Sequence, residues 1–394
     1  MKKKKWLNRN VASMGLTSMF SDTSHEMATA TLPAFLTEMV GAAAAPQLLG
    51  LITGLSDASS SFVKTFSGWL SDKLRNRKTL SVLGYFLTGL FVGTIGFARN
   101  WIEVLIYRVL GWMGRGTREP PRDALLAESV DKRFYGHAFG FHRALDTLGA
   151  IIGPLIAFFF IPLIGFRNIF FLSFIPGALA VLIIAIGVKE RVKGKHNIKS
   201  FIGHIRSLPK EFQAFLFIMF IFGIGNFNRT LLLLRVQEVL SPTLGIVVAG
   251  SMAVLFYTIR NITQAVADYS VGSLSDKIGK KIPLLLGFFL FGIMSLGFIY
   301  SSTNIFYFIL LFAISGVSAA AYTALEKAYA ADLLSSNIRG TGYGVLQTVD
   351  GIGDFISSFV VGTLWIALSP GIAFVYSAAF SFIASFLLLV FMKR

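Results

Sequence analysis

Basic side chains recur along one apolar segment, residues 101–127: they are Arg108, Arg115, Arg118 and Arg122. Three of them are spaced by seven residues, and at about 100° per residue this spacing keeps them on one face of a helix. The guanidinium group binds two oxygens of a carboxylate or phosphate at once, so this face predicts a site for an anionic or zwitterionic small molecule. Lys64 and Arg143, in two other apolar segments, are expected to join it.

Acidic residues beside these arginines support a second interpretation. Glu119 lies four residues after Arg115, and Asp123 directly follows Arg122. Residues four apart on a helix form ion pairs, and a buried ion pair often serves structure alone. A charge inside a membrane costs about 2.5–3.5 kcal/mol even on a lenient scale, so the arginines are expected either to bind a solute or to form a structural network. The sequence leaves both alternatives open.

Two consecutive prolines, Pro120 and Pro121, stand within the same segment. Proline lacks the backbone N–H and clashes with the preceding turn, so we expect the helix to break here. A broken helix with glycines nearby, here Gly114 and Gly116, is one way in which membrane proteins present backbone and charge to a polar pathway.

Acidic side chains in the segment 11–37 could carry protons. Asp22 and Glu26 are one helical turn apart, and two carboxylates this close cannot both ionise at low cost away from water. One of them is expected to hold a proton near neutral pH, as proton coupling requires. Asp146, one turn after His142, is a second candidate for protonation.

Two other roles for these acids stay open. Asp22 or Glu26 could pair with an arginine of the apolar segments 101–127 or 211–239. Together with His25 they also have a spacing that permits oxygen-rich ligation of a hard cation. A lone histidine in a polar stretch is more often a hydrogen-bonding residue, so we predict no metal ion.

The segments that carry these residues belong to an internal repeat. The motif around Asp72 recurs around Asp276, an offset of 204 residues that continues without a gap into later glycines and acids. The repeated positions are Gly68, Asp72, Lys73 and Arg77 in the first copy and Gly272, Asp276, Lys277 and Lys281 in the second. Two fused halves in an apolar chain are typical of secondary transporters. We predict six-helix bundles at 1–190 and 211–394, joined by a cytoplasmic linker at 191–210.

The composition indicates a membrane protein. Hydrophobic residues make up 54% of the 394 residues and charged residues only 14%. Apolar runs of membrane-spanning length must be helices, because no water satisfies the backbone in the bilayer. We predict an all-α membrane protein whose twelve transmembrane helices lie at 11–37, 46–71, 79–98, 101–127, 136–162, 168–188, 211–239, 244–275, 282–301, 304–331, 340–367 and 371–392.

Charge is distributed unevenly along the chain. Lysine and arginine number 36 against 20 acids, a net charge of +16, and the excess lies in alternate loops. The positive-inside rule therefore places both termini in the cytoplasm, with the protein in the inner or plasma membrane, and nucleic acid is not an expected partner. The chain has no cysteine and no Gly-rich nucleotide loop, so we predict neither an enzyme nor a cofactor.

The six-plus-six repeat, the central linker and the acidic-basic loop after the second and eighth spans resemble the major facilitator superfamily over the whole chain. The loop around Asp276 is the closer match to the family pattern. The family's fifth-helix pattern is present as Gly149, Gly153 and Pro154, and in the family it marks antiporters more than importers. The resemblance implies alternating access by two bundles, with the repeated motif gating the cytoplasmic side.

We therefore expect a monomeric, proton-coupled secondary active transporter of a small organic anion or zwitterion in the lipid bilayer. The fifth-helix pattern favours an antiporter that exports its solute. Proton-linked import of an organic anion or siderophore is one alternative, and movement of an anionic lipid is another.

Overall fold

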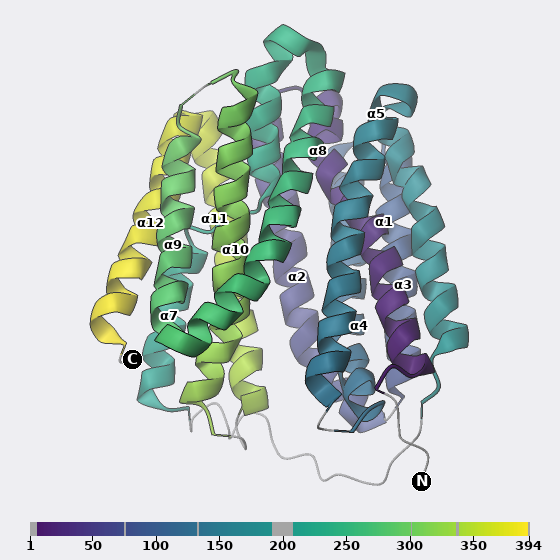
Figure 1. Cartoon of the computed structure of the whole chain (residues 1–394). Coiled ribbons are helices and arrows are strands. Elements are labelled where there is room, and N and C mark those ends of the chain that lie inside the picture. Colours follow the sequence, from purple (N-terminus) through teal and green to yellow (C-terminus); the bar gives the residue numbers. More distant parts are fainter. Residues whose placement is uncertain are drawn as a thin grey trace. The chain divides into compact units, whose positions relative to one another are not determined.

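The computed structural model is helical in its described part, which comprises residues 6–74, 76–131, 134–190, 208–300, 302–335 and 339–392 (Figure 1). The side chains of residues 69, 72–74, 276 and 339–341 lie outside this description. In chain order the elements are α1 (Arg9–Val40), α2 (Ala45–Leu74), α3 (Arg77–Thr94), the 3-10 helix η1 (Ile95–Phe97), α4 (Trp101–Glu128), α5 (Tyr135–Gly187), α7 (Lys210–Gly223), α8 (Thr230–Ile278), α9 (Lys281–Gly297), α10 (Ile305–Leu333), α11 (Arg339–Ala367) and α12 (Pro370–Phe391). The all-α prediction is confirmed.

Two of these helices continue through a kink at a glycine. Gly165 in α5 has φ 75° and Gly245 in α8 has φ 76°, a conformation that residues other than glycine disfavour. The helix α5 therefore covers two predicted spans, 136–162 and 168–188. The helix α8 covers the end of the seventh predicted span and all of the eighth. Six described helices reach the length and hydropathy of a membrane span, α5 and α8 among them.

The predicted span 211–239 is interrupted, and predicting one continuous helix there was wrong. The residues between α7 and α8 are not helical. Polar groups of α11 satisfy the backbone of this interruption: the hydroxyl of Ser357 donates to the Asn226 carbonyl oxygen at 2.9 Å, and the Asn228 N–H donates to Ser358 at 3.0 Å. The break is tolerated because its polar groups have partners within the protein.

The predicted break at Pro120 and Pro121 is also wrong, because α4 runs through both prolines. Residues 120 and 121 lack the N–H groups that would bond the carbonyl oxygens of Gly116 and Thr117. The hydroxyl of Ser67 on α2 lies against both oxygens, at 3.2 Å from Gly116 and 3.0 Å from Thr117. The single O–H donor of a neighbouring helix is therefore shared between the two carbonyl oxygens that lost their backbone donors.

The chain forms two compact units, and α2 is divided between them. The first unit comprises residues 1–35 and 59–198, and the second comprises residues 36–58 and 199–394. The predicted bundles 1–190 and 211–394 differ from these units chiefly in the placement of the start of α2, and they stay a prediction from the repeat. Most of the predicted linker 191–210 lies outside the described residues.

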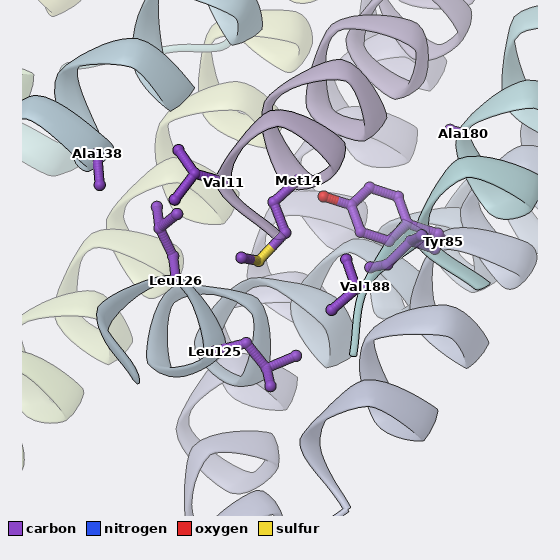
Figure 2. Packing of buried hydrophobic residues seen from close by; sticks show 9 residues of the cluster. Val11, Met14, Tyr85, Leu125, Leu126, Ala138, Ala180 and Val188 are labelled. Atoms are coloured by element: carbon purple, nitrogen blue, oxygen red, sulfur yellow. The ribbon is translucent and has the colours of Figure 1, made fainter. Parts of the chain in front are cut away.

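The first unit has an apolar core that ends beside its polar residues. Figure 2 shows Val11 and Met14 of α1 close to Leu125 and Leu126 of α4, with Tyr85 of α3 at the edge of the cluster. All five side chains are buried. In a membrane such contacts stabilise by close packing rather than by exclusion of water. The core fixes α1, α3 and α4 relative to one another, and these helices carry the site described next.

Candidate functional site: a charge network in the first unit

Arg118 stands at the centre of the polar network. It donates from Nη1 to the hydroxyl of Ser21 on α1, and its Nη2 lies 3.6 Å from Oδ1 of Asp22. Its guanidinium group also lies over the ring of Tyr85, 4.3 Å from the ring centroid. Only 2% of the Arg118 side chain is exposed, so its charge is balanced inside the protein by Asp22. This is the ion pair between the first and fourth spans that the sequence left open.

Close helix contacts hold these side chains in register. A Cβ on Gly84 of α3 would lie 2.6 Å from the carbonyl oxygen of Gly114 on α4, and a Cβ on Gly153 of α5 would lie 2.5 Å from the Thr23 carbonyl oxygen on α1. Only glycine permits backbones to approach this closely. The glycines near the arginines and in the fifth-helix pattern therefore serve to bring α3 against α4 and α5 against α1.

His25 connects the two acids that were predicted to act together. Its Nδ1 lies 3.3 Å from Oδ1 of Asp22, and its Nε2 lies 3.3 Å from Oε1 of Glu26. Nε2 is also 3.4 Å from Nη1 of Arg115, and the ring meets Trp112 edge-on at 5.9 Å. Asp22, His25 and Glu26 are all buried. Within the described residues, no group of three histidine or acidic side chains has the arrangement of a metal site.

Asp146 on α5 joins the same network. Its Oδ1 accepts a hydrogen bond from the Ser18 hydroxyl at 2.5 Å, and its Oδ2 lies 3.7 Å from Nη1 of Arg143. Ser18 lies one helical turn before Asp22 on α1, so this hydrogen bond holds Asp146 against the part of α1 that carries Asp22. The structure thus brings Asp22 together with Asp146, in addition to the expected neighbour Glu26.

Lys64, Arg115 and Glu119 form a more accessible part of the network. Oε2 of Glu119 lies 2.7 Å from the ammonium group of Lys64, and Oε1 accepts a hydrogen bond from Nε of Arg115 at 2.9 Å. These side chains are 22% (Lys64), 28% (Arg115) and 20% (Glu119) exposed. The sequence predicted the Arg115–Glu119 pair, which is confirmed, but not the contact with Lys64.

The remaining arginines of α4 are held by nearby residues. Nε and Nη2 of Arg122 lie 2.9 and 2.8 Å from Oδ1 of Asp123, as the network alternative predicted. Arg108 is buried, and its guanidinium carbon lies 3.9 Å from the ring centroid of Trp112. Both a solute site and a structural network are therefore compatible with α4. The part-exposed cations are the ones that a solute can reach most directly.

The repeated motif lies at the end of α2 and α8 and at the start of α3 and α9. Gly68 faces Pro120, since a Cβ on Gly68 would lie 3.5 Å from the proline Cβ, and Gly272 has open space around it. Lys277 is exposed. The side chains of Asp72, Lys73 and Asp276 lie outside the described part, so their gating role stays a prediction.

After each copy of the motif, an ion pair connects the beginning of the next helix to the end of the helix that follows it. Nη1 of Arg77 lies 2.5 Å from Oε1 of Glu128, and Nζ of Lys280 lies 2.7 Å from Oδ2 of Asp332. Glu128 and Asp332 occupy equivalent positions of the 204-residue repeat. Lys281 instead donates to the Met392 carbonyl oxygen at 2.5 Å. In the first half this ion pair links the start of α3 to the end of α4. In the second half it links the residue before α9 to the end of α10.

The second unit holds polar contacts that sequence analysis missed. Oδ2 of Asp57 on α2 accepts a hydrogen bond from the Asn228 side-chain amide at 2.6 Å, and Oδ1 of Asn228 accepts one from the Thr230 N–H at 3.0 Å. Arg260 of α8 is buried and donates to Gln264 at 3.0 Å. The available signal was the group of polar residues Asn226, Asn228, Arg229 and Thr230 between two apolar runs.

Comparison with known proteins assigns the chain to a family. The family model described as Major Facilitator Superfamily matches residues 14–258 and 214–394. An MFS-type transporter of Methanocaldococcus jannaschii is 36% identical over 391 residues, which cover 97% of this chain and 95% of that protein. The cis,cis-muconate transport protein of Acinetobacter baylyi is 23% identical, over 88% of this chain and 85% of that protein.

Solved structures share the fold at low sequence identity. A nucleoside transporter aligns with a TM-score of 0.83 at 12% identity and covers 98% of this chain and 100% of its own. A D-xylose-proton symporter aligns with a TM-score of 0.75 at 14% identity and covers 99% and 98%. The fold, the length of the matches and the repeated architecture agree: the chain belongs to the major facilitator superfamily of membrane transporters.

Proposed function

We propose that this protein is a proton-coupled secondary active transporter of a small organic anion or zwitterion. The observation that carries the proposal is that cations of α4 and α2 share one polar network with the acids of α1 and α5. It would operate as a monomer in the cell's inner membrane, with both termini in the cytoplasm. Its two halves would expose the site alternately to either side.

The proposed coupling groups are Asp22, Glu26 and Asp146. Arg118 lies close to Asp22, and Asp146 accepts a hydrogen bond from Ser18, one helical turn before Asp22 on α1. A proton taken up by this pair of carboxyl groups removes the charge that balances Arg118. Arg118 is on α4, beside Arg115 on the same helix, so a change in its pairing is transmitted to the cations that would hold the solute.

The proposed solute-binding groups are the basic residues Lys64, Arg115, Arg118, Arg122 and Arg143. Arginine and lysine donors suit a carboxylate. The relative from Acinetobacter baylyi transports cis,cis-muconate, a dicarboxylate, according to its name. We therefore place organic carboxylates first among the solute classes for this chain.

We propose export by antiport as the direction of transport. The support is the fifth-helix pattern Gly149, Gly153 and Pro154. Gly149 packs against the carbonyl oxygen of Met19, and Gly153 packs against that of Thr23. The glycines of the pattern therefore allow α5, which carries Asp146, to pack closely against α1, which carries Asp22.

Transport by purified protein in proteoliposomes tests the proposal. Sorbate and trans,trans-muconate share a six-carbon diene and carry one and two carboxylates, and sorbyl alcohol is their neutral analogue. When the lumen is made acidic, as an antiporter requires, we expect at least one of the two anions, but not the alcohol, to be taken up in excess of uptake by protein-free liposomes. Uptake driven only by an acidic exterior would reverse the direction. No preference for either anion over the alcohol would refute an anion transporter.

A further inference from the structure

We infer that Glu119 sets the charge of the solute that the site accepts, by acting as an internal carboxylate between Lys64 and Arg115. This inference rests on the proposed anion transport and names a residue that controls it. Glu119 was expected from the sequence only as a structural partner of Arg115.

The geometry is that of a bound carboxylate. The two oxygens of Glu119 serve different cations: Oε2 is 2.7 Å from Nζ of Lys64, and Oε1 is 2.9 Å from Nε of Arg115. One cation comes from α2 and the other from the preceding turn of α4. A carboxylate of a solute would use the same kinds of donor, so Glu119 occupies the place of a solute group when the site is empty.

Both cations retain donors for a second anion. An ammonium group has three N–H donors and a guanidinium group has five. In the described part of the chain, Lys64 uses its ammonium group on Glu119, and Arg115 contacts Glu119 through Nε and His25 through Nη1. The part-exposed side chains of Lys64 and Arg115 leave these donors within reach of a solute.

The charges of this group determine the expected preference. Lys64 and Arg115 carry two positive charges and Glu119 one negative charge, a net charge of +1. A monocarboxylate neutralises this group, whereas a dicarboxylate leaves an excess negative charge in a low-dielectric site. Removal of the Glu119 charge raises the net charge to +2 and should favour the dicarboxylate.

Binding of sorbate and trans,trans-muconate to the purified full-length protein tests the inference. We expect Glu119→Gln to shift the ratio of their dissociation constants toward muconate by about tenfold or more, as loss of one close charge contact implies. Glu103→Gln is the matched control, because it makes the same change on the same helix but at its first turn, where the carboxylate accepts hydrogen bonds from the Arg99 N–H and the Asn100 amide. It should leave the ratio within about twofold of wild type.

A double variant distinguishes charge from structure. Lys64→Gln/Glu119→Gln keeps the net charge at +1 through Arg115 alone, and its ratio should return toward wild type. If Glu119→Gln alone does not fold, the double variant is compared with Lys64→Gln, whose net charge is 0, and the double variant should bind muconate better relative to sorbate than Lys64→Gln does. An unchanged ratio in a folded Glu119→Gln, an equal shift in Glu103→Gln, or a double variant that keeps a muconate preference would overturn the inference while leaving anion transport intact. Wild-type protein that binds neither anion better than sorbyl alcohol would refute the proposed function and this inference together.

Discussion

Arg115 and Arg118 lie close together on α4 but have different surroundings. Arg118 is buried between Asp22 and Tyr85, and Arg115 is part-exposed beside Glu119. Arg118→Ala leaves Asp22 buried without its cation, so we expect a loss of about 3–5 kcal/mol in the free energy of unfolding. Arg115→Ala should instead weaken anion binding by one to two decades, equivalent to about 1.5–3 kcal/mol.

Thermal unfolding of the empty protein, measured beside sorbate binding, checks this pair of variants. Arg118→Lys should recover part of the stability, because the charge returns without the guanidinium fork. If Arg115→Ala lowers the stability of the empty protein and weakens sorbate and sorbyl alcohol equally, Arg115 is a structural residue.

The acids of α1 allow a second prediction. Asp22→Asn/Glu26→Gln removes both carboxylates that contact His25, so neither of these two positions can take up a proton. We expect transport driven by a pH gradient to stop, while exchange of labelled for unlabelled solute across the membrane continues. The two assays on the same proteoliposomes separate coupling from binding. Normal gradient-driven transport in the double variant would exclude these acids as the coupling site.

The predictability of these contacts follows their separation in sequence. The Arg115–Glu119 pair was predictable because a helix brings residues four apart to the same face, and Arg122 and Asp123 are adjacent in the chain. The contact between Lys64 and Glu119 depends on how α2 lies against α4. That approach requires Gly116, where a Cβ would be 2.5 Å from the Ser60 carbonyl oxygen. The spacing within either segment carries no such information.

The prolines of α4 lead to a prediction about whole helices. Ser67→Ala removes the hydroxyl that lies against the Gly116 and Thr117 carbonyl oxygens, so we expect a loss of about 1–3 kcal/mol. Ser71→Ala is the control, since Ser71 is also buried on α2 but, among the described residues, its hydroxyl bonds only the Gly68 carbonyl oxygen of its own helix. It should change stability by less than about 0.5 kcal/mol. Unfolding in mixed micelles measures both variants, and equal losses would contradict the role given to Ser67.

The positions of the helices were easier to predict than whether each helix runs without interruption. Long apolar runs located the spans, because membrane helices must satisfy their own backbone. Continuity at Pro120 depended on Ser67 from another helix, and the interruption near Asn228 depended on serines of α11. Both outcomes rest on donors contributed by residues far away in the sequence, which a local pattern does not reveal.

At the scale of the whole molecule, the internal repeat was the main basis for predicting the fold correctly. The 204-residue offset relates Glu128 to Asp332, and each acid forms an ion pair with a base at the start of a neighbouring helix of its own half. A repeat of whole bundles accounts for two similar halves without any knowledge of the solute. The proposed functional residues differ between the halves: Arg118 and Asp22 of the first half correspond to Tyr322 and Asn226 of the second. A fold can therefore be predicted from what the halves share, whereas the site must be argued from where they differ.

The same repeat predicts the membrane orientation. Arg99 and Thr303 are equivalent positions and both are exposed, so parallel halves place them on the same, outer side. Lys189 is exposed in a basic stretch and is expected in the cytoplasm.

The chain has no cysteine, so Arg99→Cys, Thr303→Cys and Lys189→Cys each introduce a single reactive thiol. An impermeant maleimide added to intact cells should label the first two variants, and should label Lys189→Cys only after the membrane is opened. Labelling of Arg99→Cys and Thr303→Cys from opposite sides would rule out parallel halves, and labelling of Lys189→Cys from outside would reverse the proposed orientation.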